Sequence, residues 1–356
     1  MAHEDNDEFF KGRGAQVNTH NKFLKKKYVL EHIEGLDEPM LENTATQLFE
    51  ENPKKIVSES NSPDLSHMYS INPYQGCEHG CIYCYARNTH EYYGYNAGLD
   101  FESKIIVKEN AAAVLRKQLD NKNWKPDVIM LAGNTDCYQP AEKKYKITRQ
   151  ILEVLLEYKH PVGIITKNAL VQRDVDILQE MARLQLAQVN ISLTSLKEET
   201  RLLLEPRTAT LKRRLQTMEV LTQHNIPVRV MAAPMIPFIN SNELPEILKA
   251  SAGHGALDAG YTVVRLNGKI GEVFENWIRQ ALPDKAERVL SQIRQAHGGK
   301  LNDSRYGTRM RGEGKFVESL HQMYLVAKKK YFHGKTIPPY NLSLFKRPGN
   351  GQLDLF

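Results

Sequence analysis

Residues 74–84 read Tyr-Gln-Gly-Cys-Glu-His-Gly-Cys-Ile-Tyr-Cys, and they hold three of the four cysteines of the chain. Cys77, Cys81 and Cys84 are spaced as C-x3-C-x2-C, whereas Cys137 stands alone. A secreted disulfide scaffold would carry many more cysteines, spread over the chain. Reduced thiols this close together are typical ligands of a soft metal ion or cluster. A disulfide between Cys81 and Cys84 is the alternative.

The cysteine loop can fold its thiolates around one centre, because Gly76 and Gly80 free the backbone. An iron–sulfur cluster usually takes four cysteine ligands, so three would leave one iron open to an outside molecule. Catalytic zinc sites keep an open position in the same way. A structural zinc ion with His79 or His90 as fourth ligand is the competing hypothesis.

Short apolar runs rich in β-branched residues alternate with amphipathic stretches between residues 66 and 270. This order predicts βα units around a parallel sheet, with an open or incomplete (β/α)6-type barrel as the α/β architecture. The expected strands are Met68–Asn72, Ile105–Lys108, Val128–Ala132, Val162–Thr166, Val189–Leu193, Val228–Ala233 and Thr262–Leu266. The expected helices between them include Thr148–Tyr158, Val171–Leu186, Leu211–His224 and Leu244–Ser251. The cysteine loop then follows the first strand, at the end where such folds place their chemistry.

The rest of the chain divides into three parts. Residues 1–65 show little apolar periodicity and predict an extended N-terminal arm. Residues 271–340 predict a helical C-terminal cap, with helices at Val273–Leu282, Ala286–His297 and Phe316–Tyr331. Proline and glycine near residue 348 separate a flexible tail, residues 341–356, from the fold.

The composition of the 356 residues, 41% hydrophobic and 25% charged, excludes a fibrous or largely disordered protein. The 48 basic and 42 acidic residues leave a net charge of +6, which permits an anionic partner without requiring one. No segment approaches the roughly 18 apolar residues of a membrane helix. The acidic N-terminus lacks the pattern of a signal peptide. We therefore predict a cytoplasmic protein with no membrane association.

The cysteine spacing at the end of a first barrel strand, with the aromatic Tyr83 before the third cysteine, resembles the radical S-adenosylmethionine (SAM) superfamily. Residues 72–87 are similar to the branch related to spore photoproduct lyase, in particular to a bacterial subgroup labelled radical SAM protein or DNA repair photolyase-like. The stretches 12–15, 204–207 and 299–305 extend this resemblance over nearly the whole chain. It implies a [4Fe–4S] cluster on Cys77, Cys81 and Cys84, with SAM chelating the fourth iron. Reductive cleavage of SAM would give a 5′-deoxyadenosyl radical that abstracts a substrate hydrogen.

The same resemblance implies seven further contacts to SAM: Tyr83, Thr135, Asp136, Lys167, Ser192, Arg207 and Met235. Tyr83 would lie beside the adenine, and Thr135 with Asp136 matches a hydroxyl–acid pair of the spore lyase branch. Five of these positions also have a plainer explanation: aromatic packing for Tyr83, a turn for Thr135 and Asp136, solvated surface for Lys167, and core filling for Met235.

Cys137 is a candidate catalytic residue. Spore photoproduct lyases use a cysteine near this strand end as a hydrogen donor, but the aligned position holds Gly133 here. Cys137 lies on the other side of the Thr135–Asp136 pair, where an inert thiol is an equally good interpretation. This departure argues against the spore reaction itself.

Two C-terminal features indicate partners. Between Arg305 and Lys335, eight basic residues stand against two glutamates and are mixed with aromatics, a pattern that suits a nucleic-acid groove or else a solvated helix face. The last five residues, Gln352 to Phe356, read Gln-Leu-Asp-Leu-Phe and resemble the motif that binds the bacterial sliding clamp. A terminal peptide that docks on its own domain is the alternative.

These observations predict a radical SAM enzyme, lyase-like, whose favoured substrate is a nucleic-acid base in lesion repair or modification. A reductant such as flavodoxin or ferredoxin would supply the electron. One alternative is an iron–sulfur or zinc module recruited to the clamp without radical turnover. The other is radical SAM chemistry on a small metabolite.

Overall fold

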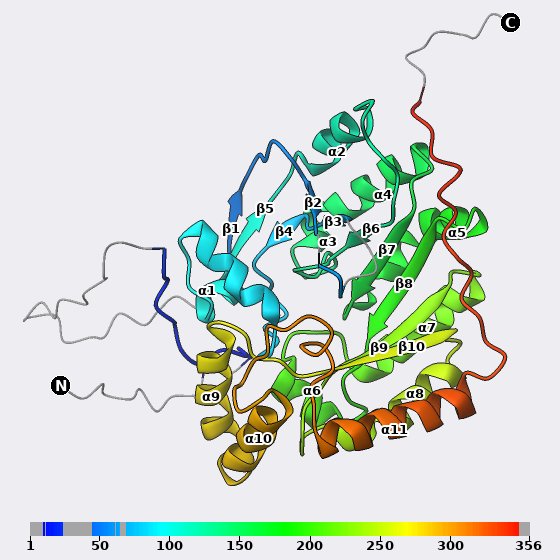
Figure 1. Cartoon of the computed structure of the whole chain (residues 1–356). Helices are drawn as coiled ribbons and strands as arrows, with labels where there is room; N and C mark the ends of the chain where they lie inside the picture. The colour runs from blue at the N-terminus through cyan, green and yellow to red at the C-terminus, as the bar shows by residue number, and fades with distance from the viewer. Residues whose placement is uncertain (1–9, 11, 24–44, 61, 65–68, 349–356) are drawn as a thin grey trace, which may run out of the picture.

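The computed structural model of the chain describes residues 10, 12–23, 45–60, 62–64 and 69–348. Figure 1 shows one large sheet with helices along its outer side. Three further helices from the C-terminal part of the chain, α9 to α11, lie at the bottom of this view. No helix within the described ranges is long and apolar enough to cross a membrane. The sliding-clamp motif at Gln352–Phe356 lies outside the described residues, so it stays a prediction from the sequence.

The large sheet confirms the expected α/β fold with parallel strands. Its strand order is β10-β9-β8-β7-β6-β3-β2, and each neighbouring pair is parallel except β2 with β3. The strands are β2 (Val57–Glu59), β3 (Tyr69–Ile71), β6 (Ile129–Leu131), β7 (Val162–Thr166), β8 (Ala187–Ser192), β9 (Val228–Met235) and β10 (Asp258–Val263). The six parallel strands, β3 and β6 to β10, form an open barrel. The antiparallel strand β2 extends it beside β3, and the two edge strands, β10 and β2, do not pair with each other.

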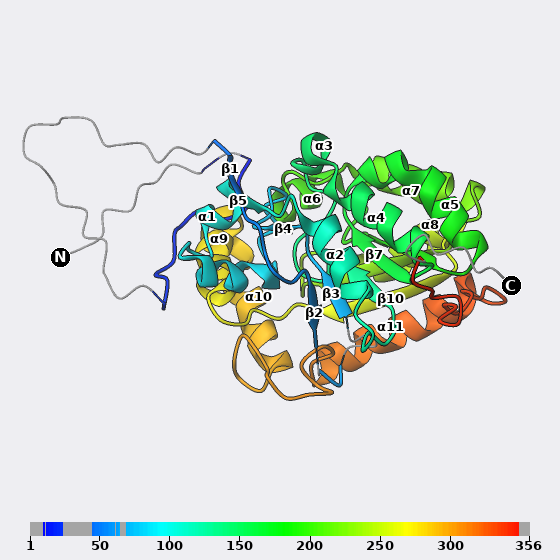
Figure 2. The ribbon, with the colours of Figure 1, turned by 90° about the horizontal axis from the view of Figure 1, so that it is seen from above.

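The segments between the strands form helices because apolar residues recur in them at helical spacing. These apolar residues face the sheet. Those on the barrel are α2 (Ala111–Leu119), α3 (Glu142–Tyr145), α4 (Ile147–Glu157), α5 (Val175–Arg183), α6 (Glu198–Leu204), α7 (Leu211–Gln223) and α8 (Leu244–Gly253). Short 3-10 turns, η2 (Ala169–Asp174) and η3 (Ser241–Glu243), precede α5 and α8. The view in Figure 2 shows α4, α5 and α7 lying side by side along one face.

Two of the expected strands differ from the prediction. The segment expected at Ile105–Lys108 forms β5 (Lys104–Val107), which lies outside the barrel and pairs with β1 (Gln47–Glu50) and β4 (Tyr74–Gln75). This small sheet holds the start of the cysteine loop, because β4 ends two residues before Cys77. The strand expected at Thr262–Leu266 begins earlier, as β10, because Asp258 pairs with Arg229 and starts the ladder to β9.

The C-terminal helices are α9 (Ile270–Ala281), α10 (Pro283–Ala296) and α11 (Lys315–Tyr331). Trp277 and Phe274 of α9 are fully buried in a second apolar core, which also contains Ile82 and Tyr83 of the cysteine loop. Helix α11 packs instead along α8 (Figure 1). Residues 341–348 run back along the barrel, where the N–H of Asn341 donates to the carbonyl of Gln185 at 2.9 Å.

Candidate active site

A cavity of about 280 Å³ lies at the carboxyl ends of the barrel strands. Eight of the eleven residues predicted for the site line it: Cys77, Cys81, Tyr83, Cys84, Thr135, Asp136, Lys167 and Ser192. They come from segments between residues 77 and 192, and they meet because parallel strands bring their carboxyl ends to one edge of the sheet. The structure thus brings eight of the residues singled out in the sequence together around one cavity.

The cysteine loop turns tightly where its glycines lie. Gly76 has a φ of +80°, and a Cβ there would lie 2.8 Å from the carbonyl oxygen of Lys104, so only glycine fits. The N–H of Cys77 donates to the carbonyl of Phe101 at 2.9 Å. Cys84 then precedes the 3-10 helix η1 (Tyr85–Tyr93). The loop is thus fixed at both ends by backbone geometry.

A buried ion pair stabilises the outer side of this loop. Arg87 and Glu102 are both 0% exposed, and their side chains meet at 2.5 Å. Arg87 also donates two hydrogen bonds to the carbonyl of Cys81, at 3.0 and 2.9 Å. Glu102 in turn accepts the N–H groups of Gly14 and Ala15 at 3.1 and 2.7 Å. A single carboxylate therefore joins the cysteine loop to the N-terminal segment.

This N-terminal segment, residues 12–23, crosses directly over the cysteine loop. A Cβ at Gly14 would lie 1.7 Å from the carbonyl oxygen of Gly80, so the two backbones are in contact and no side chain fits between them. Further along, Asn21 donates to the carbonyls of Glu91 and Tyr95 at 2.9 and 2.8 Å. We call residues 12–23 the strap.

The three thiols of the loop suit a cluster better than a single metal ion. Burial raises the pKa of Cys77, Cys81 and Cys84, so each holds its proton until a metal displaces it. Among the described residues, no three His, Cys, Asp or Glu side chains converge on one point, as one zinc ion requires. In an iron–sulfur cluster each cysteine binds a different iron, so the thiolates need not converge.

Neither histidine of the zinc hypothesis is directed at the thiols. The Nδ1 of His79 lies 3.3 Å from a carboxylate oxygen of Asp136, and its Nε2 lies 3.2 Å from the side-chain nitrogen of Asn168. His90 is buried between the rings of Tyr95 and Phe101, and this burial lowers its pKa to about 4. The donor set that remains is three cysteines, which fits a cluster with one open iron.

Asp136 holds the ends of two strands together. Its carboxylate accepts the N–H of Lys167 at 2.8 Å, the N–H of Tyr138 at 2.9 Å and the hydroxyl of Thr166 at 2.8 Å, besides its contact with His79. Burial alone would raise the pKa of Asp136, but these partners, His79 foremost, hold the pKa at about 2. Asp136 is therefore a charged group whose acceptors are already filled by the protein.

Thr135 and Ser192 offer free acceptor capacity to the pocket. The hydroxyl of Thr135 donates to the carbonyl of Tyr74 at 2.6 Å, which leaves its oxygen able to accept. Ser192 is buried at the end of β8, and its carbonyl accepts a hydrogen bond from Arg214 at 3.1 Å. Thr135 follows β6 and Ser192 ends β8, so the two hydroxyls come from either side of β7.

A second carboxylate, which the sequence analysis did not single out, supports the other side of the cysteines. Glu205 is fully buried and accepts hydrogen bonds from the hydroxyl of Tyr83 and from Thr194, the latter at 2.9 Å. It also forms an ion pair with Arg214 at 2.5 Å. Burial would raise the pKa of Glu205, but Arg214 and Lys167 hold it at about 2. Glu205 lies within the stretch 204–207 that carries the family resemblance, and this resemblance was the one signal in the sequence that could have identified it.

Lys167 brings a positive charge next to the thiols. Its Nζ lies 5.9 Å from the centre of the Tyr83 ring. Burial on its own lowers the pKa of Lys167, but Cys81 and Glu205 outweigh it and leave the pKa raised. The ammonium is therefore charged and can attract an anionic group bound beside the cysteines.

Three predicted residues are not brought to the pocket. Arg207 is exposed on the outside of the cysteine loop, where its N–H donates to the carbonyl of His79 at 3.3 Å. Met235 is fully buried in the main core at the end of β9. Cys137 is also fully buried there, because the chain turns away after Asp136 and Thr148 holds the Cys137 carbonyl at 2.6 Å.

The wall opposite the cysteines has a different character. Arg265, just after β10, and Arg309 and Met310, from the loop between α10 and α11, line it. Arg309 is paired with Asp64, whereas Arg265 forms no ion pair with any described residue. Tyr85 of the lining is 51% exposed. Tyr306 is 62% exposed and adjoins the lining through Arg309, which lies 4.5 Å from the centre of its ring. We call Tyr85, Arg265, Tyr306 and Arg309 the far wall.

Only part of the basic stretch from Arg305 to Lys335 is free to meet a ligand. Lys328 pairs with Asp258 at 2.9 Å, and Lys335 donates to the carbonyls of Ala252 and Ala256. Arg305 is held by Asp303 and Glu313. The predicted groove is therefore not continuous, and of this stretch Arg309 and Met310 line the pocket.

Comparisons with known proteins agree with this geometry. The family profile described as Radical SAM superfamily matches residues 71–250. An uncharacterized protein of Mycobacterium tuberculosis is 34% identical over 230 residues, which are 64% of this chain and 68% of that protein. An uncharacterized protein of Methanocaldococcus jannaschii is 26% identical over 69% of this chain and 88% of its own length.

Solved structures share the fold. A mutant of spore photoproduct lyase superposes with a TM-score of 0.59 at 16% identity, covering 81% of this chain and 80% of that one. A second structure of that enzyme, with bound AdoMet (SAM) and dinucleoside spore photoproduct, has a TM-score of 0.58 at 15% identity and covers 81% and 79% of the two chains. At this low sequence identity, the similarity between the two proteins shows a shared fold alone.

Proposed function

Since the chain belongs to the radical SAM superfamily, we propose that Cys77, Cys81 and Cys84 hold a [4Fe–4S] cluster and that the enzyme uses SAM to abstract hydrogen from a nucleic-acid base. The family predicted from the sequence is thus confirmed, and with it an enzyme of radical SAM chemistry. The observation that supports the proposed site is the meeting of three cysteine thiols, two of them on buried residues, with Thr135 and Ser192 in one strand-end pocket.

The bound cofactors would supply one-electron cleavage of the SAM sulfonium and a 5′-deoxyadenosyl radical. The protein supplies the positions of the groups around them. Thr135 and Ser192 present hydroxyl oxygens, and Lys167 presents a positive charge beside the thiols. Asp136 and Glu205, whose acceptors are filled by protein donors, fix the strand ends and the Tyr83 hydroxyl. The second apolar core packs against Cys81, Ile82 and Tyr83 and fixes this part of the cysteine loop.

The far wall supports nucleic acid as the substrate class. Arg265, which forms no ion pair with any described residue, suits a phosphate oxygen. The exposed Tyr85 of the lining and the exposed Tyr306 beside Arg309 suit stacking against bases. A base in a duplex cannot reach the pocket, so a flipped or single-stranded nucleotide is the expected substrate. The lining contributed by described residues includes no cysteine besides the three of the cluster loop, so the proposed reaction uses no cysteine hydrogen donor.

Reductive cleavage of SAM tests the proposal. The anaerobically reconstituted enzyme, given dithionite and SAM, should form 5′-deoxyadenosine, and the Cys84→Ala variant should form none. Single-stranded DNA or RNA should raise the rate. Product formation that ignores every nucleic acid would favour a small metabolite as substrate. A protein with full iron and sulfide content that never cleaves SAM would favour a binding module without radical turnover.

A further inference from the structure

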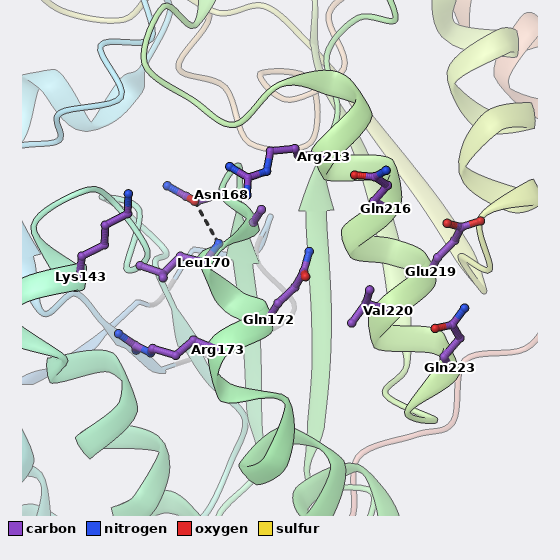
Figure 3. A pocket seen from close by; sticks show the side chains of 11 residues that line it. Lys143, Asn168, Leu170, Gln172, Arg173, Arg213, Gln216, Glu219, Val220 and Gln223 are labelled. Atoms are coloured by element: carbon purple, nitrogen blue, oxygen red, sulfur yellow. Dashed lines mark hydrogen bonds between the residues drawn. The ribbon is translucent and has the colours of Figure 1, made fainter.

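A second, larger cavity of about 540 Å³ opens on the outer surface between α3, η2 and α7. Figure 3 shows Lys143 and Arg213 on either side of it, with Asn168 between them in this view. Leu170 and Gln172 of η2 form its floor. It contains no cysteine and does not overlap the strand-end pocket, so the proposed chemistry does not use it.

This outer cavity carries unneutralised positive charge. Of its three basic residues, Arg173 is paired with Glu142 at 2.6 Å and Asp174 at 2.8 Å. Within the described part of the chain, the side chains of Lys143 and Arg213 form no ion pair, and Glu219 is the one acidic residue in the lining. The neighbouring basic residues on the same elements are exposed too: Lys144, Lys146 and Lys212. The surface therefore attracts an acidic partner.

The outer cavity is also joined to the cysteine loop by direct contacts. The side chain of Asn168, which lines the cavity, lies 3.2 Å from Nε2 of His79, between Cys77 and Cys81. On the α3 side, Gln139 donates to the carbonyl of Gly76 and accepts from the N–H of Glu78, both at 3.0 Å. Only a short bonded path separates this basic surface from the residues that would hold the cluster.

We propose that this outer cavity is the docking site of the electron donor, an acidic one-electron carrier protein, with Lys143 and Arg213 contacting its carboxylates. The inference rests on the proposed function, because only a redox-active cluster needs such a partner. One electron leaves the reduced carrier and enters the oxidised cluster, and no proton or group is transferred. Charge complementarity of this kind raises the rate of encounter and is weakened by salt.

The test compares two reductants with one pair of variants. Lys143→Glu with Arg213→Glu reverses the charge of the cavity, and Lys122→Glu with Lys125→Glu makes the same change on an exposed loop before β6, at the opposite end of the barrel. With reduced flavodoxin as donor, we expect 5′-deoxyadenosine formation by the cavity variant to fall about tenfold at low salt. With dithionite, which needs no docking surface, both variants should match the wild type.

A readout independent of turnover separates this inference from the proposed function. Carbodiimide cross-linking of flavodoxin to the reconstituted enzyme should join a flavodoxin carboxylate to Lys143, and the cavity variant should bind flavodoxin about tenfold more weakly by calorimetry. Loss of activity with both reductants, or unchanged binding of flavodoxin, would overturn the docking site. Reduced affinity for single-stranded DNA with unchanged flavodoxin binding would also overturn it and assign the surface to nucleic acid. If the wild type binds flavodoxin here but never cleaves SAM, the proposed function fails and the docking site stands.

Discussion

The two walls of the strand-end pocket are built on opposite principles. On the cysteine side, Arg87, Glu102, Asp136 and Glu205 are buried and each has its hydrogen-bonding capacity met by other protein groups. On the far wall, Arg265 has no ionic partner among the described residues, and the rings of Tyr85 and Tyr306 are exposed. Both walls carry charge, but only one of them is complete without a ligand.

This difference separates two tasks within one cavity. A site for a permanent cofactor has to keep its geometry between turnovers, which fully satisfied buried networks provide. A site for an exchangeable substrate keeps some groups unpaired, because contacts already made within the protein cannot be offered to a ligand. The contrast predicts that substitutions on the cysteine side act mainly on stability, and those on the far wall mainly on binding.

Removing Glu102 should have the largest effect. Glu102→Ala leaves Arg87 buried without a partner and frees the N–H groups of Gly14 and Ala15, so the free energy of unfolding should fall by about 3–5 kcal/mol. Urea denaturation of the anaerobic protein measures this. The matched control is Glu313→Ala, which removes an exposed ion pair with Arg305 and should cost less than about 0.5 kcal/mol. Equal losses in the two variants would erase the contrast between the walls.

Acid should weaken the cysteine side through Asp136. Its pKa is about 2 in the folded protein and near 4 in the unfolded chain, so its contribution is present above pH 4 and is lost as the pH falls toward 2. We expect the wild type to lose about 2 kcal/mol more than Asp136→Asn between pH 5 and pH 2. Urea titrations at a series of pH values give both curves. Parallel curves would show that the carboxylate is not held in this network.

Arg265→Ala should give the smallest free-energy change, and it should appear in binding. Loss of one phosphate contact is expected to weaken single-stranded DNA binding about tenfold. It should also reduce the slope of the logarithm of the binding constant against the logarithm of the salt concentration by about one. Fluorescence anisotropy at several salt concentrations measures both, while iron content and unfolding stay unchanged. Arg279→Ala, on the exposed side of α9, is the control. Unchanged affinity in Arg265→Ala would remove the nucleic-acid assignment of the far wall.

The sequence predicted the cysteine side well because that side is local. The glycines, the cysteines and Tyr83 lie within nine residues, and strand-end positions such as Thr135 and Lys167 follow clear apolar runs. It was harder to predict which side chains just after a strand face the pocket and which face the core. Cys137 follows Asp136 directly, yet it is buried in the core because the chain turns there.

The positions of the far-wall residues could not be predicted from the sequence, and the reason is physical. The strand expected at Thr262–Leu266 would have placed Arg265 inside the sheet, but β10 ends at Val263 and leaves Arg265 over the pocket. Arg309 belongs to the basic stretch that the sequence analysis singled out, but its place at the pocket depends on Asp64, 245 residues away. Contacts over such distances leave little trace in local patterns.

The strap has a consequence for the order in which the enzyme matures. Residues 12–23 are synthesised before the cysteine loop, whereas the carboxylate that holds Gly14 and Ala15 comes 87 to 88 residues later. The strap therefore has no binding site until the cysteine loop and Glu102 have both been synthesised. Because the strap crosses the loop at Gly80, it settles after the loop that it covers.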